Sequence, residues 1–125
     1  HLGQAPLSGG LAILGAHIDS CRLDLKQNPL YEDGHLAFFD THYYGGIKKY
    51  QWTCIPLALI GVVFTKDGKK VDINIGLKDS DPVFYVSDLL IHMAQDQMKK
   101  TLAEGITGEQ LQAVAGTHSE EGQTP

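Results

Sequence analysis

The sequence is short of several features that would each point to a particular class of protein. It holds 125 residues with only two cysteines, Cys21 and Cys54, which argues against a disulfide framework and a zinc knuckle. The longest apolar run, residues 54–64, contains Pro56 and Gly61 and falls far short of the roughly 20 residues that span a bilayer. We therefore expect reduced thiols and no membrane anchor.

Positive charge is also scarce, and the basic residues are scattered along the chain. There are 10 Lys and Arg against 15 Asp and Glu, so the sequence offers no basic patch to a nucleic acid. Neither a charged nor an apolar leader follows His1, which predicts a protein without a signal peptide that stays in the cytoplasm. A composition of 42% hydrophobic and 20% charged residues is typical of a globular protein with a core.

The apolar pattern of the first third predicts an α/β protein. Leu11 to Ile18 is a continuous apolar run that ends at Asp19, the pattern of a strand buried on both faces of a sheet. Shorter runs with a period of two follow between residues 23 and 39. Asn28-Pro29 and Asp33-Gly34 separate them and indicate turns.

The later part of the chain is predicted to contain a hairpin. Residues 62–65 and 71–75 are two apolar runs on either side of Asp67-Gly68, a strong short-range signal for a hairpin turn.

Two helices are predicted after the hairpin. The first is capped by Ser87, runs to about Lys100, and carries an apolar side formed by Leu89, Leu90, Met93, Ala94 and Met98. Thr107 and Gln110 form a capping-box signature for a second helix that ends near Ala115. The polar residues from about 116 onward are expected to form a flexible loop.

A short motif at the end of the first predicted strand suggests metal chemistry. His17 and Asp19 lie two residues apart, so on a strand their side chains project to the same face. A carboxylate commonly orients a metal-bound imidazole and raises its basicity. The three-residue pattern also occurs by chance, so a structural or surface role remains an alternative from the residues alone.

Two longer stretches resemble aspartyl aminopeptidases and their bacterial relatives. The stretch that starts at His17 (HIDSCRLDLK) resembles the His-x-Asp-Ser-Pro segment of that family. The stretch from Thr41 (THYYGGIKKYQW), followed by IPLAL from Ile55, resembles the start of the family's insert domain. The resemblance implies that residues 1–28 belong to the catalytic zinc-peptidase domain. It assigns residues 29–125 to a mixed β/α insert domain that mediates oligomerisation.

The resemblance also implies an activity. Members of the family use two zinc ions per subunit to remove the N-terminal residue from peptides, with metal-activated water attacking the scissile carbonyl. In this sequence His17 takes the place of a zinc ligand, and Asp19 that of the catalytic carboxylate which supports it. The remaining ligands and the general base are expected downstream of the insert, so this segment alone is expected to be inactive.

His92 matches a histidine of the family's insert domain that reaches into the active site of a neighbouring subunit and contacts the substrate. A partly buried helix histidine is the alternative from the sequence alone. In the family the insert domain assembles subunits into dimers and then into a homododecamer. The aromatic group of Tyr43, Tyr44, Tyr50 and Trp52 is accordingly predicted to lie at a subunit interface.

One position departs from the family pattern, because Cys21 stands where the family usually has proline. We interpret it as a structural substitution, since a thiol four residues after His17 on an extended chain has no defined metal geometry with it. The rival interpretation of the whole chain is a non-catalytic assembly module or truncated relative built on the insert domain. A small single-zinc or redox protein that uses Cys21, Cys54 and His17 is disfavoured.

Overall fold

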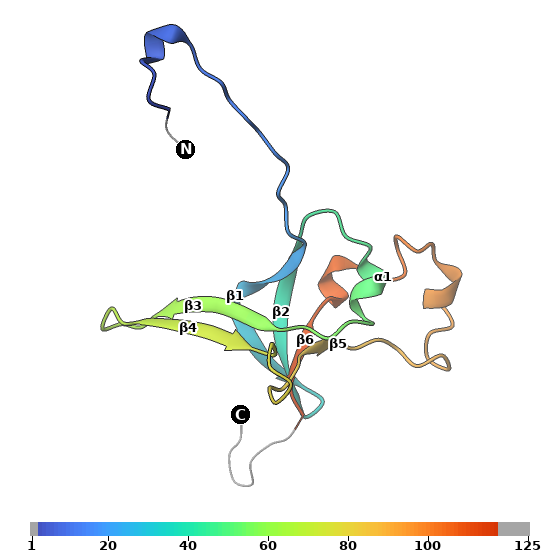
Figure 1. The fold of residues 1–125 in the computed structure, drawn as a ribbon. Coiled ribbons are helices and arrows are strands. Elements are labelled where there is room, and N and C mark those ends of the chain that lie inside the picture. Colours follow the sequence, from blue (N-terminus) through green and yellow to red (C-terminus); the bar gives the residue numbers. More distant parts are fainter. Residues whose placement is uncertain (1–2, 118–125) are drawn as a thin grey trace.

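The computed structural model describes residues 3–117, and their main body is a four-stranded antiparallel sheet (Figure 1). The strands of this sheet lie in the order β1 (Arg22–Asp33), β2 (Leu36–Tyr44), β6 (Ala113–Gly116) and β5 (Tyr85–Val86). A separate two-stranded hairpin consists of β3 (Leu59–Phe64) and β4 (Lys70–Ile75). Helical structure within the described residues is limited to α1 (Lys49–Trp52) and three short 3-10 turns, η1 (Leu7–Gly9), η2 (Gln97–Lys99) and η3 (Gly108–Gln110). The fold-class expectation is therefore confirmed only in part, because this part of the chain forms a sheet domain with little helix.

The hairpin predicted at Asp67-Gly68 and the turn predicted at Asp33-Gly34 are confirmed, whereas Asn28-Pro29 lies within β1 and is not a turn between strands. Gly34 and His35 adopt positive φ of 55° and 66° between β1 and β2, and Gly68 has φ of 81° in the loop between β3 and β4. Glycine takes such angles without the steric penalty that a Cβ brings. The two antiparallel pairs therefore form where local turn chemistry predicts them.

The buried strand expected at Leu11 to Ile18 is absent. Residues 10–21 have no regular structure and run away from the sheet as an extended segment (Figure 1). The side chains of this segment are exposed, Leu14 to 98% and Ile18 to 85%. A central strand needs pairing partners on both edges and cover on both faces. The described residues provide neither for this segment.

The helix expected from Ser87 to Lys100 is also absent, because this stretch consists of turns that end in η2. Ala94 is buried, but Leu90 is 71% exposed and Met93 69% exposed. Most of the stability of a helix in a protein comes from packing its apolar face, and residues 3–117 leave most of that face exposed. The carboxylate of Asp88 instead accepts hydrogen bonds from the backbone of Leu89 and the side chain of Gln97.

The second predicted helix is shorter than expected. The capping box of Thr107 and Gln110 is confirmed, but it begins the three-residue turn η3, and the chain then enters β6. Strand pairing with β2 and β5 extends this segment. Tertiary contacts therefore override the local helix signal. The predicted polar loop lies almost wholly outside the described residues, as do His1 and His118.

A small apolar core lies where η3 and β6 meet the sheet. Leu111 and Val86 are almost completely buried, at 0% and 1% exposure, and pack with Ile106. Tyr43, Tyr50 and Trp52 are partly buried against this cluster, together with Leu23, Ile47 and Leu57. Three of the four aromatic residues therefore contribute to the core of their own chain, and their role at a subunit interface stays a prediction.

The turn after β4 predicts a stability effect at Gly76. Its φ is 103°, and a Cβ there would lie 3.0 Å from the Cα of Ala58. Gly76→Ala is therefore expected to lower the free energy of unfolding by roughly 1–3 kcal/mol, because it combines backbone strain with a steric clash. In β3, Gly61 is the matched control, since a Cβ there meets nothing within 4 Å and Gly61→Ala should change stability by less than about 0.5 kcal/mol. Urea denaturation of both variants tests this, and equal losses would contradict it.

Candidate metal centre

The His17 and Asp19 side chains lie close together in the extended segment before β1. The Nε2 atom of His17 is 3.4 Å from Oδ2 of Asp19, and the two side chains are 85% and 47% exposed. The proximity expected from their spacing is therefore present without the strand that was predicted to carry them. The other ring nitrogen of His17, Nδ1, is the one that does not face Asp19.

The Asp19 carboxylate is also tied to the sheet. The hydroxyl of Tyr44, the last residue of β2, donates a hydrogen bond of 3.2 Å to Oδ1 of Asp19. Arg22 opens β1 directly opposite Tyr44, and the carbon of its guanidinium lies 4.0 Å from the centre of the Tyr44 ring. Sequence reasoning assigned no role in the metal site to Tyr44 or Arg22.

Arg22 is itself fixed by polar partners. Its Nε atom lies 2.7 Å from Oδ1 of Asp24, and its NH1 group donates a 3.4 Å hydrogen bond to the carbonyl of Ser20. The hydrogen bond to Asp24, with the negative charge of that carboxylate, raises the pKa of Arg22 above its ordinary value. A permanently charged guanidinium over an aromatic ring is a favourable cation–π contact.

The thiol of Cys21 lies on the sheet side of the extended segment. Its Sγ atom is 3.6 Å from the carbonyl oxygen of Gly46, and it would lie 3.3 Å from a Cβ at Gly45. Gly45 has φ of 85°, a conformation that favours glycine. Cys21 and Cys54 are free, exposed thiols, as the sequence predicts. The position usually filled by proline thus holds a side chain that packs against the Gly45-Gly46 turn.

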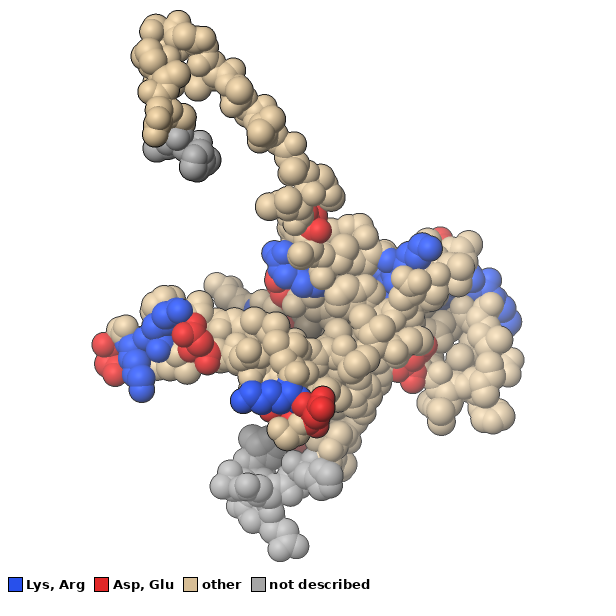
Figure 2. All heavy atoms as spheres, in the orientation of Figure 1, with Lys and Arg blue, Asp and Glu red and all other residues tan. Residues whose placement is uncertain are grey.

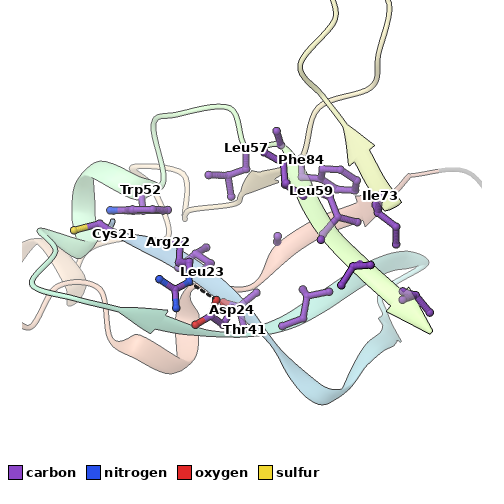
Figure 3. A pocket seen from close by; sticks show the side chains of 17 residues that line it. Cys21, Arg22, Leu23, Asp24, Thr41, Trp52, Leu57, Leu59, Ile73 and Phe84 are labelled. Atoms are coloured by element: carbon purple, nitrogen blue, oxygen red, sulfur yellow. Dashed lines mark hydrogen bonds and ion pairs between the residues drawn. The ribbon is translucent and has the colours of Figure 1, made fainter. Parts of the chain in front are cut away.

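An open groove of about 650 Å³ lies between β1 and the β3–β4 hairpin (Figure 3). Arg22, Asp24, Cys21 and Trp52 lie toward one part of it, whereas Leu59, Ile73 and Phe84 make the rest apolar (Figure 3). The apolar residues of β3 are the only sign of this groove in the sequence. Its shape depends on how the β3–β4 hairpin lies beside the sheet.

His17 and Asp19 suit part of a zinc site but not a whole one. A neutral imidazole is a zinc ligand, and an adjacent carboxylate is its usual orienting partner. Between residues 3 and 117, no three or more His, Cys, Asp and Glu side chains gather in a way that could hold a metal ion. A catalytic zinc takes three protein ligands, and the described residues do not supply that number around His17.

The structure does not bring His92 together with His17. His92 is exposed and lies in the turns between β5 and η2. Its apolar neighbours are exposed as well, namely Leu89, Leu90, Ile91, Met93, Met98 and Leu102. His42, in contrast, lies on β2 and stacks on Tyr43 with ring centres 5.5 Å apart. No helix in the described part of the chain is both long enough and apolar enough to cross a membrane.

Comparison with known proteins identifies relatives over nearly the whole sequence. The chain is 57% identical over 116 residues to the probable M18 family aminopeptidase 1 of Clostridium acetobutylicum, covering 93% of this chain and 25% of that protein. It is 52% identical over 111 residues to the probable M18 family aminopeptidase 1 of Thermotoga maritima, covering 89% of this chain and 24% of that protein. The chain thus spans about a quarter of the length of these relatives.

Solved structures give the same result. The fold matches the crystal structure of an M18 family aminopeptidase from Thermotoga maritima with a TM-score of 0.78 and 52% identity, over 86% of this chain and 24% of that one. It matches aminopeptidase I from Clostridium acetobutylicum with a TM-score of 0.76 and 55% identity, over 90% of this chain and 25% of that one. The model of the family described as aminopeptidase I zinc metalloprotease (M18) matches residues 2–125. The chain therefore belongs to the M18 family of aminopeptidase I zinc metalloproteases.

Proposed function

We propose that this chain is part of a zinc-dependent aminopeptidase that hydrolyses the N-terminal residue from peptides. The observation that carries the proposal is the contact between His17 and Asp19, 3.4 Å apart in a chain that belongs to a zinc metalloprotease family. In the complete protein two zinc ions per subunit would polarise the scissile carbonyl and make hydroxide available near neutral pH. The preferred N-terminal residue lies outside what this segment specifies.

The role of His17 in this function is to hold one zinc ion through its free ring nitrogen. The carboxylate of Asp19, 3.4 Å from the Nε2 atom, would orient the imidazole and raise its basicity. Neither residue moves a proton to the substrate. Their contribution is a metal held in one position, which is a requirement for any oriented attack on a peptide bond.

The proposed domain division places residues 1–28 in the catalytic domain and residues 29–125 in an insert domain for oligomerisation. The boundary falls within β1, in the irregular stretch between Leu25 and Leu30. Two surfaces support a role of the second part in assembly into a homododecamer built from dimers. One is the exposed apolar stretch around His92, and the other is the β3–β4 hairpin, where Ile60 and Phe64 are 65% and 67% exposed.

Figure 2 shows how charge is distributed over the hairpin. Lysine and aspartate atoms gather near its tip, where Lys70 and Asp72 form an ion pair of 2.7 Å, and uncharged atoms cover the length behind it. Exposed apolar residues such as Ile60 and Phe64 are typical of contacts between protein chains. His92 would then act in trans, at the active site of a neighbouring subunit.

Two exposed free thiols favour a reducing compartment, and we place the protein in the cytoplasm.

The alternative function is a non-catalytic assembly module built on the insert domain. The observation that favours it is that residues 3–117 hold no complete metal site. The two functions predict proteins of different composition. A complete peptidase needs the remaining metal ligands, either on the same polypeptide or on another subunit of its assembly.

The intact mass of the natural protein separates the two functions. We expect several times the 13.6 kDa of this chain, because the relatives are about four times longer. Mass spectrometry of the protein purified from its own source measures it. A mass near 13.6 kDa would contradict the peptidase proposal and support the assembly module.

A further inference from the structure

The backbone around Asp19 does not by itself fix the orientation of the Asp19 side chain. Residues 10–21 form no regular secondary structure, and the Asp19 side chain is 47% exposed. A half-exposed carboxylate on an extended segment rotates among several rotamers unless other groups hold it. An orienting partner for a metal ligand is useful only if its own orientation is fixed.

Both oxygens of Asp19 have a partner. Oδ2 faces the Nε2 atom of His17 at 3.4 Å, and Oδ1 accepts the 3.2 Å hydrogen bond from the hydroxyl of Tyr44. With one oxygen held from the sheet, the other stays directed at the imidazole. Tyr44 thus connects the end of β2 to the histidine through a single carboxylate.

Tyr44 is well placed to hold a fixed position itself. It pairs with Arg22 at the end of the β1–β2 ladder, and the Arg22 guanidinium covers its ring at 4.0 Å. Arg22 is in turn bound to Asp24 and to the carbonyl of Ser20, next to Asp19 in the chain. Figure 3 shows Arg22 and Asp24 joined by this interaction beside Thr41. The aromatic ring is therefore held by the first strand and the hydroxyl projects to the extended segment.

We propose that Tyr44 is a positioning residue of the metal centre, which holds Oδ1 of Asp19 so that Oδ2 stays on the imidazole of His17. This inference rests on the proposed function, because it gives His17 a zinc ion to hold. Arg22 supports Tyr44 by covering its ring. No part of the inference requires Tyr44 to touch zinc or substrate.

The test is the zinc affinity of the full-length protein with Tyr44→Phe, which removes the hydroxyl and keeps the ring that Arg22 covers. Removing an outer partner of a metal ligand typically weakens metal binding by 10- to 100-fold. Since Tyr44 acts one contact farther out, we expect the zinc dissociation constant to rise roughly 3- to 10-fold. Competition with a chelator of known affinity measures this constant, and excess zinc should restore full occupancy.

Tyr85→Phe is the matched control, because Tyr85 is 45% exposed on β5, an end strand that β6 separates from the β2 strand of Tyr44. It should bind zinc like the wild-type protein. An unchanged affinity in Tyr44→Phe, or an equal loss in Tyr85→Phe, would overturn the inference.

A double-substitution cycle tests whether Tyr44 acts through Asp19. In an Asp19→Ala background, Tyr44→Phe should weaken zinc binding no further, because the accepting oxygen is already gone. An additional loss in that background would show that Tyr44 acts by another route and would overturn the inference. His17→Ala in the same assay keeps the two proposals apart. If His17→Ala loses zinc while Tyr44→Phe binds normally, the proposed function stands and only the role of Tyr44 fails.

Discussion

Replacing His17 with alanine in the full-length protein is expected to remove one zinc equivalent per subunit and nearly all peptidase activity. A catalytic zinc site has three protein ligands, and loss of one leaves too few to retain the ion at micromolar or lower free zinc. The carboxylate of Asp19, 3.4 Å away, then has no imidazole to orient. Zinc content by elemental analysis and turnover of a peptide substrate are the two measurements.

His42→Ala is the matched control for the loss of His17. His42 is also exposed, but it lies on β2, opposite Asp24 of β1, and its ring stacks on Tyr43. It should keep the full zinc content and activity. A His17→Ala protein with full zinc content would remove His17 from the metal site, and with it the main support for the peptidase proposal.

Asp19→Asn should have a smaller effect in the same direction. The amide keeps the shape of the side chain but lacks the negative charge that raises the basicity of the imidazole. The order of zinc loss expected from this geometry is therefore His17→Ala first, Asp19→Asn second and Tyr44→Phe third.

Elements that form because of local turn residues could be predicted from the sequence. Elements that depend on packing against other parts of the protein could not. The β1–β2 and β3–β4 hairpins follow from Gly34 and Gly68, which allow the positive φ of the turns. The run from Leu11 to Ile18 has the composition of a buried strand, but burial depends on neighbours that the described residues lack. The Ser87 to Lys100 stretch fails as a helix for the same reason, since its apolar side chains remain exposed.

The contacts of the candidate site also divide into one that follows from local spacing and one that depends on strand pairing. The contact of His17 with Asp19 follows from their spacing along an extended chain. The contact of Tyr44 with Asp19 depends on the register of two strands. In that register residues 26–29 of β1 lie opposite Asp40 alone, between the Leu25–Thr41 and Leu30–Phe39 pairs.

This irregularity is what sets Arg22 opposite Tyr44. A hairpin continued without it would place a different residue of the chain against Arg22, and no pattern in the sequence fixes how many residues such a bulge takes up. Asn28-Pro29 does signal an interruption, because proline cannot donate to a strand ladder. The presence of the irregularity was thus predictable, and its consequence for the metal centre was not.

If His92 contacts the substrate as proposed, His92→Ala is expected to leave the zinc content intact and slow turnover by roughly 10- to 100-fold, because a group that would orient the substrate is lost. In the proposed function His92 contacts the substrate and is not a metal ligand, so its loss should not release metal. Zinc analysis and steady-state kinetics measure both effects. Unchanged kinetics would leave His92 as an ordinary surface residue.

Mixing two defective variants tests whether His92 acts in trans. A His17→Ala subunit keeps an intact His92, and a His92→Ala subunit keeps an intact metal centre. If each site takes His92 from one neighbouring subunit, random assembly of equal amounts gives about one quarter of sites with both parts intact.

Activity should then rise well above that of either variant assembled alone. If His92 acts within its own subunit, no site in the mixture has both parts and activity does not rise. Mixing His92→Ala with a subunit that carries both substitutions is the control, because neither subunit can then supply His92. A gain of activity in that control would show that mixing itself restores activity. A gain confined to the first mixture would show that catalysis depends on assembly through the surface around His92.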